Sequence, residues 1–310
     1  MRVKAVIIGC GKIAGGFDNV DSNKIRTHAK AYANNNKTNL VGVCDSNIKK
    51  AKTFGKKWNV KYITSSVDDL IKDCNPDIVS ICTNTEDHYF LAKKLINLGI
   101  KNIWMEKPSS ENLLKTIKLS RLIEKNKTYF TISYYRRHEK PLSNLNLEIK
   151  KIGQVQNIRA IYSKGLKNNG SHILDFLLFY FPNFINIKLI DFDKDNYYPS
   201  ASFIIKYKNF NIDILSVNYK KFEMFEIDII GTKGRINLRN GGRNIDIYKL
   251  VKNKYYHNYK NLDYKKSINI TFDDTFKKIL SNILKKNTIT NIEAEIRVMK
   301  IIDKIENKLK

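Results

Sequence analysis

The stretch that decides the fold is Val3-Lys-Ala-Val-Ile-Ile-Gly9-Cys-Gly11-Lys-Ile-Ala14, near the start of the 310-residue chain. The apolar run predicts a strand buried on both faces, and the glycines predict a tight turn directly after it. In a dinucleotide-binding turn, Gly9 would permit the turn, Gly11 would let a pyrophosphate approach the backbone, and Ala14 would be small where helix meets strand. The alternative is a glycine-rich turn of an α/β protein that binds no nucleotide.

The first 130 residues alternate short apolar runs with longer amphipathic stretches. Helical spacing is visible, for example, at Leu91, Leu95 and Leu98. Alternation of this kind produces a parallel sheet with helices on both faces. The predicted strands are 3–8, 40–44, 78–82, 102–105 and 129–133, and the predicted helices are 47–58, 66–73, 86–98 and 109–125.

From about residue 134 the pattern changes to period-2 runs joined by short polar turns, which is typical of antiparallel strands. Helices are predicted at 141–151, 171–181, 274–285 and 293–309, and strands at 202–207, 211–218, 225–230, 235–238 and 244–250. We therefore predict an α/β protein with two domains. A Rossmann-type doubly wound parallel sheet occupies residues 1–133, and an α/β domain with a large, mostly antiparallel sheet occupies residues 134–310.

The net charge of +26 comes from 56 Lys plus Arg against 30 Asp plus Glu. Each half of the chain carries +13, so there is no basic arm or basic domain. The lysines are spread singly or in pairs along a sequence that is rich in Lys, Asn and Ile. This distribution favours a compositional background over a nucleic-acid-binding surface.

The four cysteines, Cys10, Cys44, Cys74 and Cys82, lie in the first third of the chain. Their spacing suits neither a zinc site nor a disulfide framework, which favours a reducing compartment. The first apolar run is too short for a signal sequence, and no segment approaches the ~18 apolar residues of a membrane span. We predict a cytoplasmic protein without a metal, nucleic-acid or membrane partner.

Two further constellations follow predicted strands. Asp45 ends the second strand, where an acidic residue accepts hydrogen bonds from the adenosine ribose and favours NAD over NADP, although Ser46 and Lys49 leave NADP open. Asp45 comes 36 positions after Gly9, beyond the usual ~20, and an insertion at 17–27 accounts for the excess. Glu106-Lys107-Pro108 ends the fifth strand, where side chains of a parallel sheet face the ligand crevice. By itself this triplet is a strand-end turn with a solvated lysine.

Together with other segments, these pieces resemble the Gfo/Idh/MocA family of nicotinamide-dependent oxidoreductases. The resemblance covers nearly the whole chain, and its segments are Gly9-Cys-Gly11-Lys-Ile13-Ala14, His28-Ala-Lys-Ala-Tyr32, Asp45, Thr83-Asn84 with His88, Glu106-Lys107-Pro108, 152–155, Gly170-Ser-His172-Ile-Leu-Asp175 and 229–234. It implies a Rossmann domain that binds NAD(P) and a second domain for substrate binding and oligomerisation. A homodimer or homotetramer is expected.

The resemblance also implies roles for single residues at the cofactor. It places Gly9, Gly11, Lys12 and Ile13 at the pyrophosphate turn, Asp45 at the adenosine ribose, Thr83, Asn84 and His88 near the nicotinamide end, Glu106 near the nicotinamide ribose, and Lys107 beside the reacting carbon.

At the substrate, His172 falls where the family commonly has a catalytic histidine, with Asp175 three residues on. The chain departs from the family at Asn168, where many relatives carry an aspartate. An amide cannot titrate, but it can hydrogen-bond a substrate hydroxyl.

The cofactor accepts the hydride, so the protein must accept or donate the one proton of the reacting hydroxyl. We predict that His172 is the acid/base, since histidine titrates near neutral pH, and that Lys107 polarises the reacting oxygen and relays the proton. The alternative for His172 is a helix N-terminal residue that positions backbone. Arg136 and Arg137 follow the sixth strand and either clamp an anion or form a solvated surface pair.

These predictions lead to an NAD-dependent dehydrogenase that oxidises a ring hydroxyl of a nucleotide- or phosphate-activated sugar, or runs that reaction in reverse. One alternative is a reductase of a non-sugar carbonyl or imine. Another is an NAD-binding regulatory or interaction protein without turnover, which Asn168 favours and the pair Lys107 and His172 opposes. Glu293 and Glu295 on the last predicted helix do not share a face and are not expected to form an acid/base pair.

Overall fold

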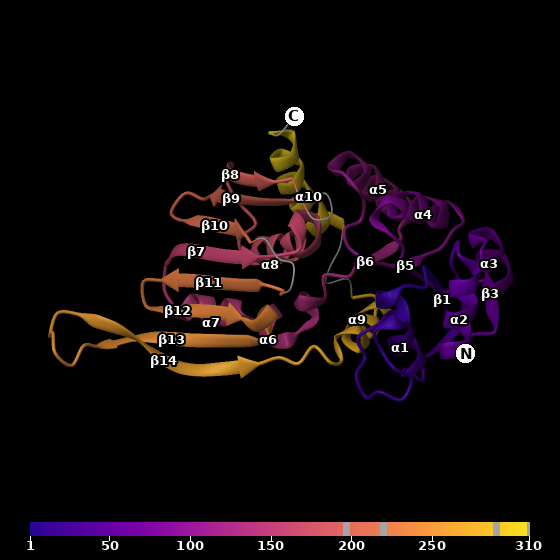
Figure 1. Ribbon diagram of the computed structural model, residues 1–310, viewed down its shortest axis with the longest axis horizontal. Helices are drawn as coiled ribbons and strands as arrows, with labels where there is room; N and C mark the ends of the chain where they lie inside the picture. The colour runs from indigo at the N-terminus through magenta and orange to yellow at the C-terminus, as the bar shows by residue number, and fades with distance from the viewer. Residues whose placement is uncertain (195–198, 218–221, 288–291, 309–310) are drawn as a thin grey trace. The chain divides into compact units, whose positions relative to one another are not determined.

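The computed structural model describes residues 1–194, 199–217, 222–287 and 292–308. The chain forms two compact units, drawn in Figure 1, and each includes part of the C-terminal region. The first unit is Met1–His138 with Phe272–Ile296, and the second is Glu139–Thr271 with Arg297–Lys310. Helix α9 (Thr275–Leu284) therefore belongs to the first unit, while helix α10 (Ile292–Asn307) begins in the first and continues in the second.

The first unit is built on a six-stranded parallel sheet in the order β3-β2-β1-β4-β5-β6. Its strands are β1 (Val3–Ile8), β2 (Thr38–Cys44), β3 (Tyr62–Thr64), β4 (Ile78–Ile81), β5 (Asn102–Met105) and β6 (Tyr129–Ile132). The strand order reverses between β1 and β4, which is the switch point where ligands bind in doubly wound sheets. The predicted Rossmann topology is confirmed.

Helices connect these strands: α1 (His28–Ala33), α2 (Ile48–Trp58), α3 (Val67–Cys74), α4 (Thr85–Asn97) and α5 (Leu113–Asn126). Asn47, Ser66 and Asn112 cap the starts of α2, α3 and α5 by accepting backbone N–H groups. The predicted helices are confirmed, and that at 109–125 begins four residues later than predicted. The short β3 and α1 were not predicted as elements.

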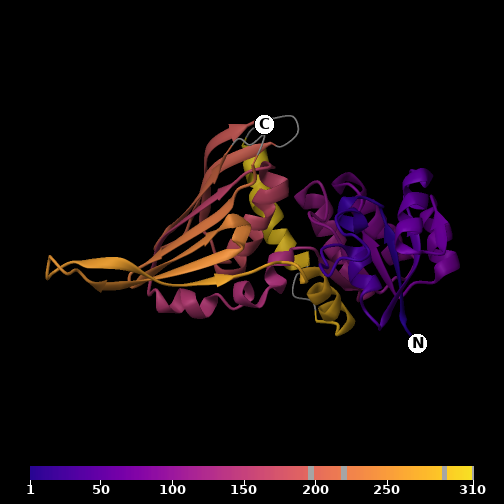
Figure 2. The ribbon, with the colours of Figure 1, turned by 60° about the horizontal axis from the view of Figure 1, so that its bottom comes forward.

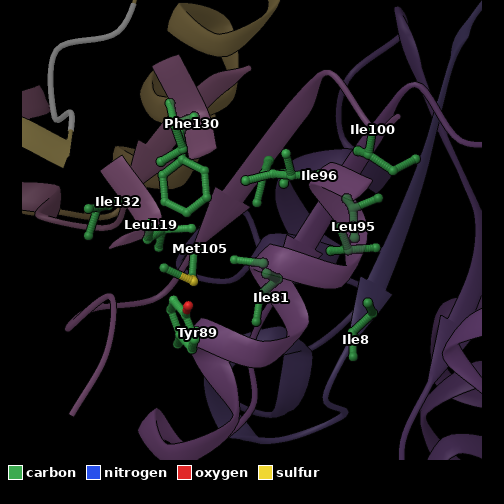
Figure 3. Packing of buried hydrophobic residues seen from close by; sticks show 14 of the residues in the cluster. Ile8, Ile81, Tyr89, Leu95, Ile96, Ile100, Met105, Leu119, Phe130 and Ile132 are labelled. Atoms are coloured by element: carbon green, nitrogen blue, oxygen red, sulfur yellow. The ribbon is translucent and has the colours of Figure 1, made fainter. Parts of the chain in front are cut away.

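Apolar side chains from strands and helices pack together on one face of this sheet, as Figure 3 shows. Ile81 and Met105 on the strands and Leu95 and Leu119 on α4 and α5 are all 0 % exposed. Burial of each such side chain contributes about 1.5–3 kcal/mol. A second cluster around Trp104 covers the other face. The strands of this sheet have continuous apolar sequences because both faces of the sheet are covered by other side chains.

The second unit contains an eight-stranded sheet in the order β14-β13-β12-β11-β7-β10-β9-β8. Among the strands that the structure describes here, only β7 and β10 pair in parallel, so the predicted mostly antiparallel sheet is confirmed. The strands are β7 (Val155–Tyr162), β8 (Asn186–Asp193), β9 (Ser200–Lys206), β10 (Asn211–Ser216), β11 (Phe225–Gly231), β12 (Gly234–Arg239), β13 (Asn244–Lys252) and β14 (Lys260–Asn269). Figure 2 shows α8 (Ser171–Tyr180) and α10 along one face of this sheet.

Three details of the second unit differ from the sequence prediction. The single helix predicted at 141–151 is wrong, because two short helices, α6 (Lys140–Ser143) and α7 (Asn146–Lys151), meet at Leu145. Strands β7, β8 and β14 were not predicted, and β14 has no alternation because most of its residues are exposed. The predicted ends at 218 and 309 lie outside the described residues. Among the described helices, none is both long and apolar enough to span a membrane.

Candidate functional site

The turn after β1 has the geometry of a phosphate cradle. Gly9 has φ +90°, and a Cβ there would lie 2.7 Å from the backbone of Cys82 and Thr83. A Cβ on Gly11 would meet no atom within 4 Å. Only glycine therefore fits at Gly9, for reasons of packing and conformation. At Gly11 the open space leaves room for a ligand to approach the backbone.

The residues after this turn form one helical turn, Lys12–Gly16, which packs against α2. Ala14 is 0 % exposed, as a small residue between helix and strand should be. Gly15 is tighter still, because a Cβ there would lie 2.4 Å from Trp58 Nε1. The insertion at 17–27 follows this turn and precedes α1, in the place predicted for it.

Asp45 joins the ends of the first two strands. Its carboxylate accepts hydrogen bonds from the backbone N–H of Cys10 (2.8 Å) and of Asn47 (2.9 Å). A carboxylate offers about four lone-pair sites, so acceptor capacity remains for ribose hydroxyls. The aspartate is thus held rigidly at the carboxyl end of β2, where the fold binds an adenosine ribose.

A cleft of about 460 Å³ lies at these strand ends. Five of the predicted cofactor residues line it: Gly9, Gly11, Asp45, Thr83 and Asn84. Lys12 and Ile13 belong to the following helical turn and are not among the lining residues. The open cradle at Gly11, the fixed carboxylate of Asp45 and the switch-point cleft together fit a dinucleotide.

His88 lies one turn into α4 and is 1 % exposed. Its Nδ1 is 2.7 Å from the carbonyl oxygen of Pro108, and its Nε2 is 3.0 Å from that of Thr83. The imidazole therefore joins the loop after β4 to the loop after β5. This geometry is that of a residue that positions both loops.

Glu106 is held by a histidine that was not among the predicted site residues. The Nε2 of His28 lies 3.0 Å from Glu106 Oε1, and its Nδ1 lies 3.0 Å from Ser80 Oγ, which contacts Tyr32 Oη at 2.7 Å. Burial raises the pKa of Glu106, but the hydrogen bond and charge of His28, with smaller contributions from Ser133 and Lys107, bring it below its usual value. His28 could have been identified from the sequence, because it begins the segment His28–Tyr32, which is one of those that carry the family resemblance.

Lys107 follows Glu106 and precedes a cis peptide bond to Pro108. Burial lowers the pKa of its ammonium to about 8, against the opposing effect of Glu106 and Glu295, and Arg136 lowers it further. The side chain of Lys107 is partly buried, so it is not the fully solvated lysine of the alternative interpretation. A lysine with a pKa near 8 exchanges its proton close to neutral pH.

Arg136 and Arg137 lie in a 3-10 turn, Tyr135–His138, directly after β6. Each is 4 % exposed, so the alternative of a solvated surface pair is wrong. The Arg136 guanidinium carbon lies 4.7 Å from the centre of the Tyr135 ring and 6.0 Å from that of Phe272. The two rings contact each other edge to face, with centres 5.4 Å apart, so the cation lies beside an aromatic pair of the first unit.

The predicted substrate residues of the second unit lie on adjoining turns. Asn168 belongs to the turn Gly165–Gly170, and its carbonyl oxygen accepts a hydrogen bond from Ser171 Oγ at 2.7 Å. His172 is the second residue of α8 and is 6 % exposed, and Asp175 is 2 % exposed. Residues three apart share a helix face, so His172 and Asp175 lie on one side of α8. Within the described residues, no group of three or more His, Cys, Asp or Glu is arranged to hold a metal ion.

The doubly wound sheet, the glycine turn and the acid after β2 define a dinucleotide-binding domain of the Rossmann class. Residues 3–134 match the profile of the Gfo/Idh/MocA oxidoreductase family, described as an NAD-binding Rossmann fold. The match to this family thus covers the first domain of the chain.

Known proteins similar to this chain are distant. An oxidoreductase of Formosa agariphila is 29 % identical over 44 % of this chain and 39 % of its own length. The D-glucoside 3-dehydrogenase of Escherichia coli is 26 % identical over 34 % of this chain and 27 % of its own length. The alignments thus span less than two fifths of either relative.

Similar solved structures cover nearly the whole fold. The UDP-N-acetylglucosamine 3-dehydrogenase of Acidithiobacillus ferrooxidans superposes with a TM-score of 0.73 over 97 % of this chain and 95 % of its own, at 17 % identity. This likeness shows that both units have the same fold as the corresponding parts of that structure.

Proposed function

We propose that this protein is an NAD-dependent dehydrogenase acting on a ring hydroxyl of a nucleotide- or phosphate-activated sugar, or a reductase of the corresponding ketone. The observation that carries the proposal is Lys107, a partly buried ammonium at the carboxyl end of β5 whose pKa is lowered to about 8 by desolvation. Two of the similar proteins are named as sugar 3-dehydrogenases, which supports this substrate class.

The residues that would hold the cofactor are those of the cleft and its neighbours. Gly9, Gly11, Lys12 and Ile13 would receive the pyrophosphate, Asp45 the adenosine ribose, and Thr83, Asn84, His88, Glu106 and Lys107 the nicotinamide half. When bound, NAD supplies a hydride acceptor at its nicotinamide ring. The carboxylate of Asp45 would repel a 2′-phosphate, so we propose NAD as the preferred dinucleotide.

The protein itself must remove the proton of the substrate hydroxyl. We propose His172 as the general base, because histidine titrates near neutral pH. The Lys107 ammonium would stabilise negative charge on the reacting oxygen, and near pH 8 it would exchange that proton. Asn168 and Asp175 would hydrogen-bond other hydroxyls of the substrate and fix its orientation.

An anionic substrate is favoured by the cations of the first unit. Arg136 is buried beside Lys107, and Arg137 follows it, so both guanidinium groups offer donors in a desolvated setting. The net charge of +26 would raise the local concentration of anionic ligands. A homodimer or homotetramer is part of the proposal, because the family commonly assembles through the large sheet.

The test uses purified protein with NAD and a panel of nucleotide sugars, sugar phosphates and free sugars, followed by absorbance of the reduced cofactor. We expect turnover with an activated sugar and a loss of 100-fold or more in kcat for Lys107→Met, as for other acid/base groups. Faster turnover of neutral inositols or free hexoses would refute the anionic substrate. Tight NAD binding without turnover of any carbonyl or hydroxyl compound would favour a regulatory protein instead.

A further inference from the structure

Glu295 is the only member of the pair Glu293 and Glu295 that is buried. Glu293 is exposed, whereas Glu295, two residues along α10, is 0 % exposed. A buried carboxylate is costly unless hydrogen bonds or opposite charges compensate for lost hydration. The surroundings of Glu295 supply both.

Two donors from distant parts of the chain reach this carboxylate. The backbone N–H of Ser109 donates to Oε1 at 2.6 Å, and the hydroxyl of Tyr134 donates to Oε2 at 2.6 Å. Ser109 stands two residues after Lys107, and Tyr134 stands two residues before Arg136. One carboxylate thus fixes the two segments that carry these cations.

We propose that Glu295 is a positioning residue for Lys107: its carboxylate holds the turn after Lys107 and supplies a second negative charge beside the Lys107 ammonium. This inference rests on the proposed function, in which Lys107 stabilises charge on the reacting oxygen. Through Glu295, helix α10 would then contribute to the protonation state of Lys107.

Charged and titratable groups near Lys107 come from several elements of the first unit. Glu106 adjoins it at the end of β5, and the charges of Glu295 on α10 and Arg136 in the turn after β6 both act on its ammonium. Behind them, His28 of α1 contacts Glu106, and Tyr134 contacts Glu295. The two carboxylates favour the ammonium, while burial and Arg136 favour the neutral amine.

The expected consequence is a change in the titration of Lys107 when the charge of Glu295 is removed. Glu295→Gln keeps the size of the side chain and an oxygen for the N–H of Ser109. The amine of Lys107 then loses one of its two anionic neighbours, so its titration midpoint should fall by about 1 pH unit. Glu293→Gln is the matched control, because it removes the same charge from an exposed position of the same helix.

The experiment measures the reactivity of Lys107 in the full chain with acetic anhydride as a function of pH, read by mass spectrometry of the Lys107 peptide. We expect a wild-type midpoint near pH 8, an unchanged midpoint in Glu293→Gln and a lower one in Glu295→Gln. An equal midpoint in folded Glu295→Gln and wild type would overturn the proposal.

A second variant covers loss of folding in Glu295→Gln, which circular dichroism detects. Glu295→Asp keeps the charge but withdraws it by one methylene, so the midpoint of Lys107 should fall by a few tenths of a pH unit. No fall in this variant would also overturn the proposal. Since labelling needs no substrate, failure of the sugar assay and failure of this inference are separate results.

Discussion

Replacing Gly9 and Gly11 with alanine, one at a time, separates the two roles of the glycine turn. At Gly9 the backbone has φ +90°, and the added methyl would lie 2.7 Å from backbone atoms of the strand β4 loop, which cannot move aside as a side chain can. At Gly11 φ is −83° and the methyl meets nothing within 4 Å. The same substitution therefore meets opposite surroundings two residues apart.

The magnitudes follow from these surroundings. For Gly9→Ala, a strained backbone costs about 1–3 kcal/mol and overpacking costs a similar amount, so the free energy of unfolding should fall by about 2–6 kcal/mol. For Gly11→Ala it should change by less than about 1 kcal/mol, since alanine suits the conformation. NAD binding should nevertheless weaken about tenfold or more in Gly11→Ala, because the methyl occupies the space that a pyrophosphate would approach.

Guanidinium unfolding followed by tryptophan fluorescence measures the first effect, and titration calorimetry with NAD measures the second. The two tryptophans, Trp58 and Trp104, are both buried in the first unit and report on its unfolding. Equal losses of stability in the two variants would refute the packing argument at Gly9. Unchanged NAD affinity in Gly11→Ala would refute the assignment of the cradle.

Three other predictions concern charge and catalysis. Because the pKa of Lys107 is lowered from 10.5 to about 8, the unfolded chain binds more protons than the folded one between these values, and stability gains from Lys107 as pH rises through this window. The stability of Lys107→Met relative to wild type should therefore fall by about 3 kcal/mol from pH 8 to 10.5 in denaturant titrations, and a constant difference would contradict the lowered pKa. Asp45→Ser should reduce the preference for NAD over NADP by about tenfold in calorimetry with both dinucleotides, and an unchanged ratio would remove Asp45 from cofactor selection. His172→Asn should lower kcat by about 100-fold or more with little effect on the Kd of NAD, and near-wild-type turnover would leave His172 as a helix N-terminal residue that positions backbone.

Much of the first unit is visible in the sequence because its strands are covered on both faces. Continuous apolar runs such as Val3–Ile8 then mark each strand, and the residues directly after them mark the ligand edge. Asp45 and Lys107 were found in this way. Strand β14 was missed because an exposed strand has no apolar alternation to detect.

The sequence by itself determined most strands and helices of the first unit, apart from the short β3 and α1, as well as the glycine turn and the type of cofactor that such a turn receives. These features depend on neighbouring residues, so local patterns suffice to reveal them. Only the tertiary structure decided which side chains surround Lys107. Glu106 meets His28 across 78 positions, and Ser109 meets Glu295 across 186. Contacts of this kind arise from packing of distant elements, and the charge state of Lys107 depends on them because a buried ammonium is governed by its nearest charges.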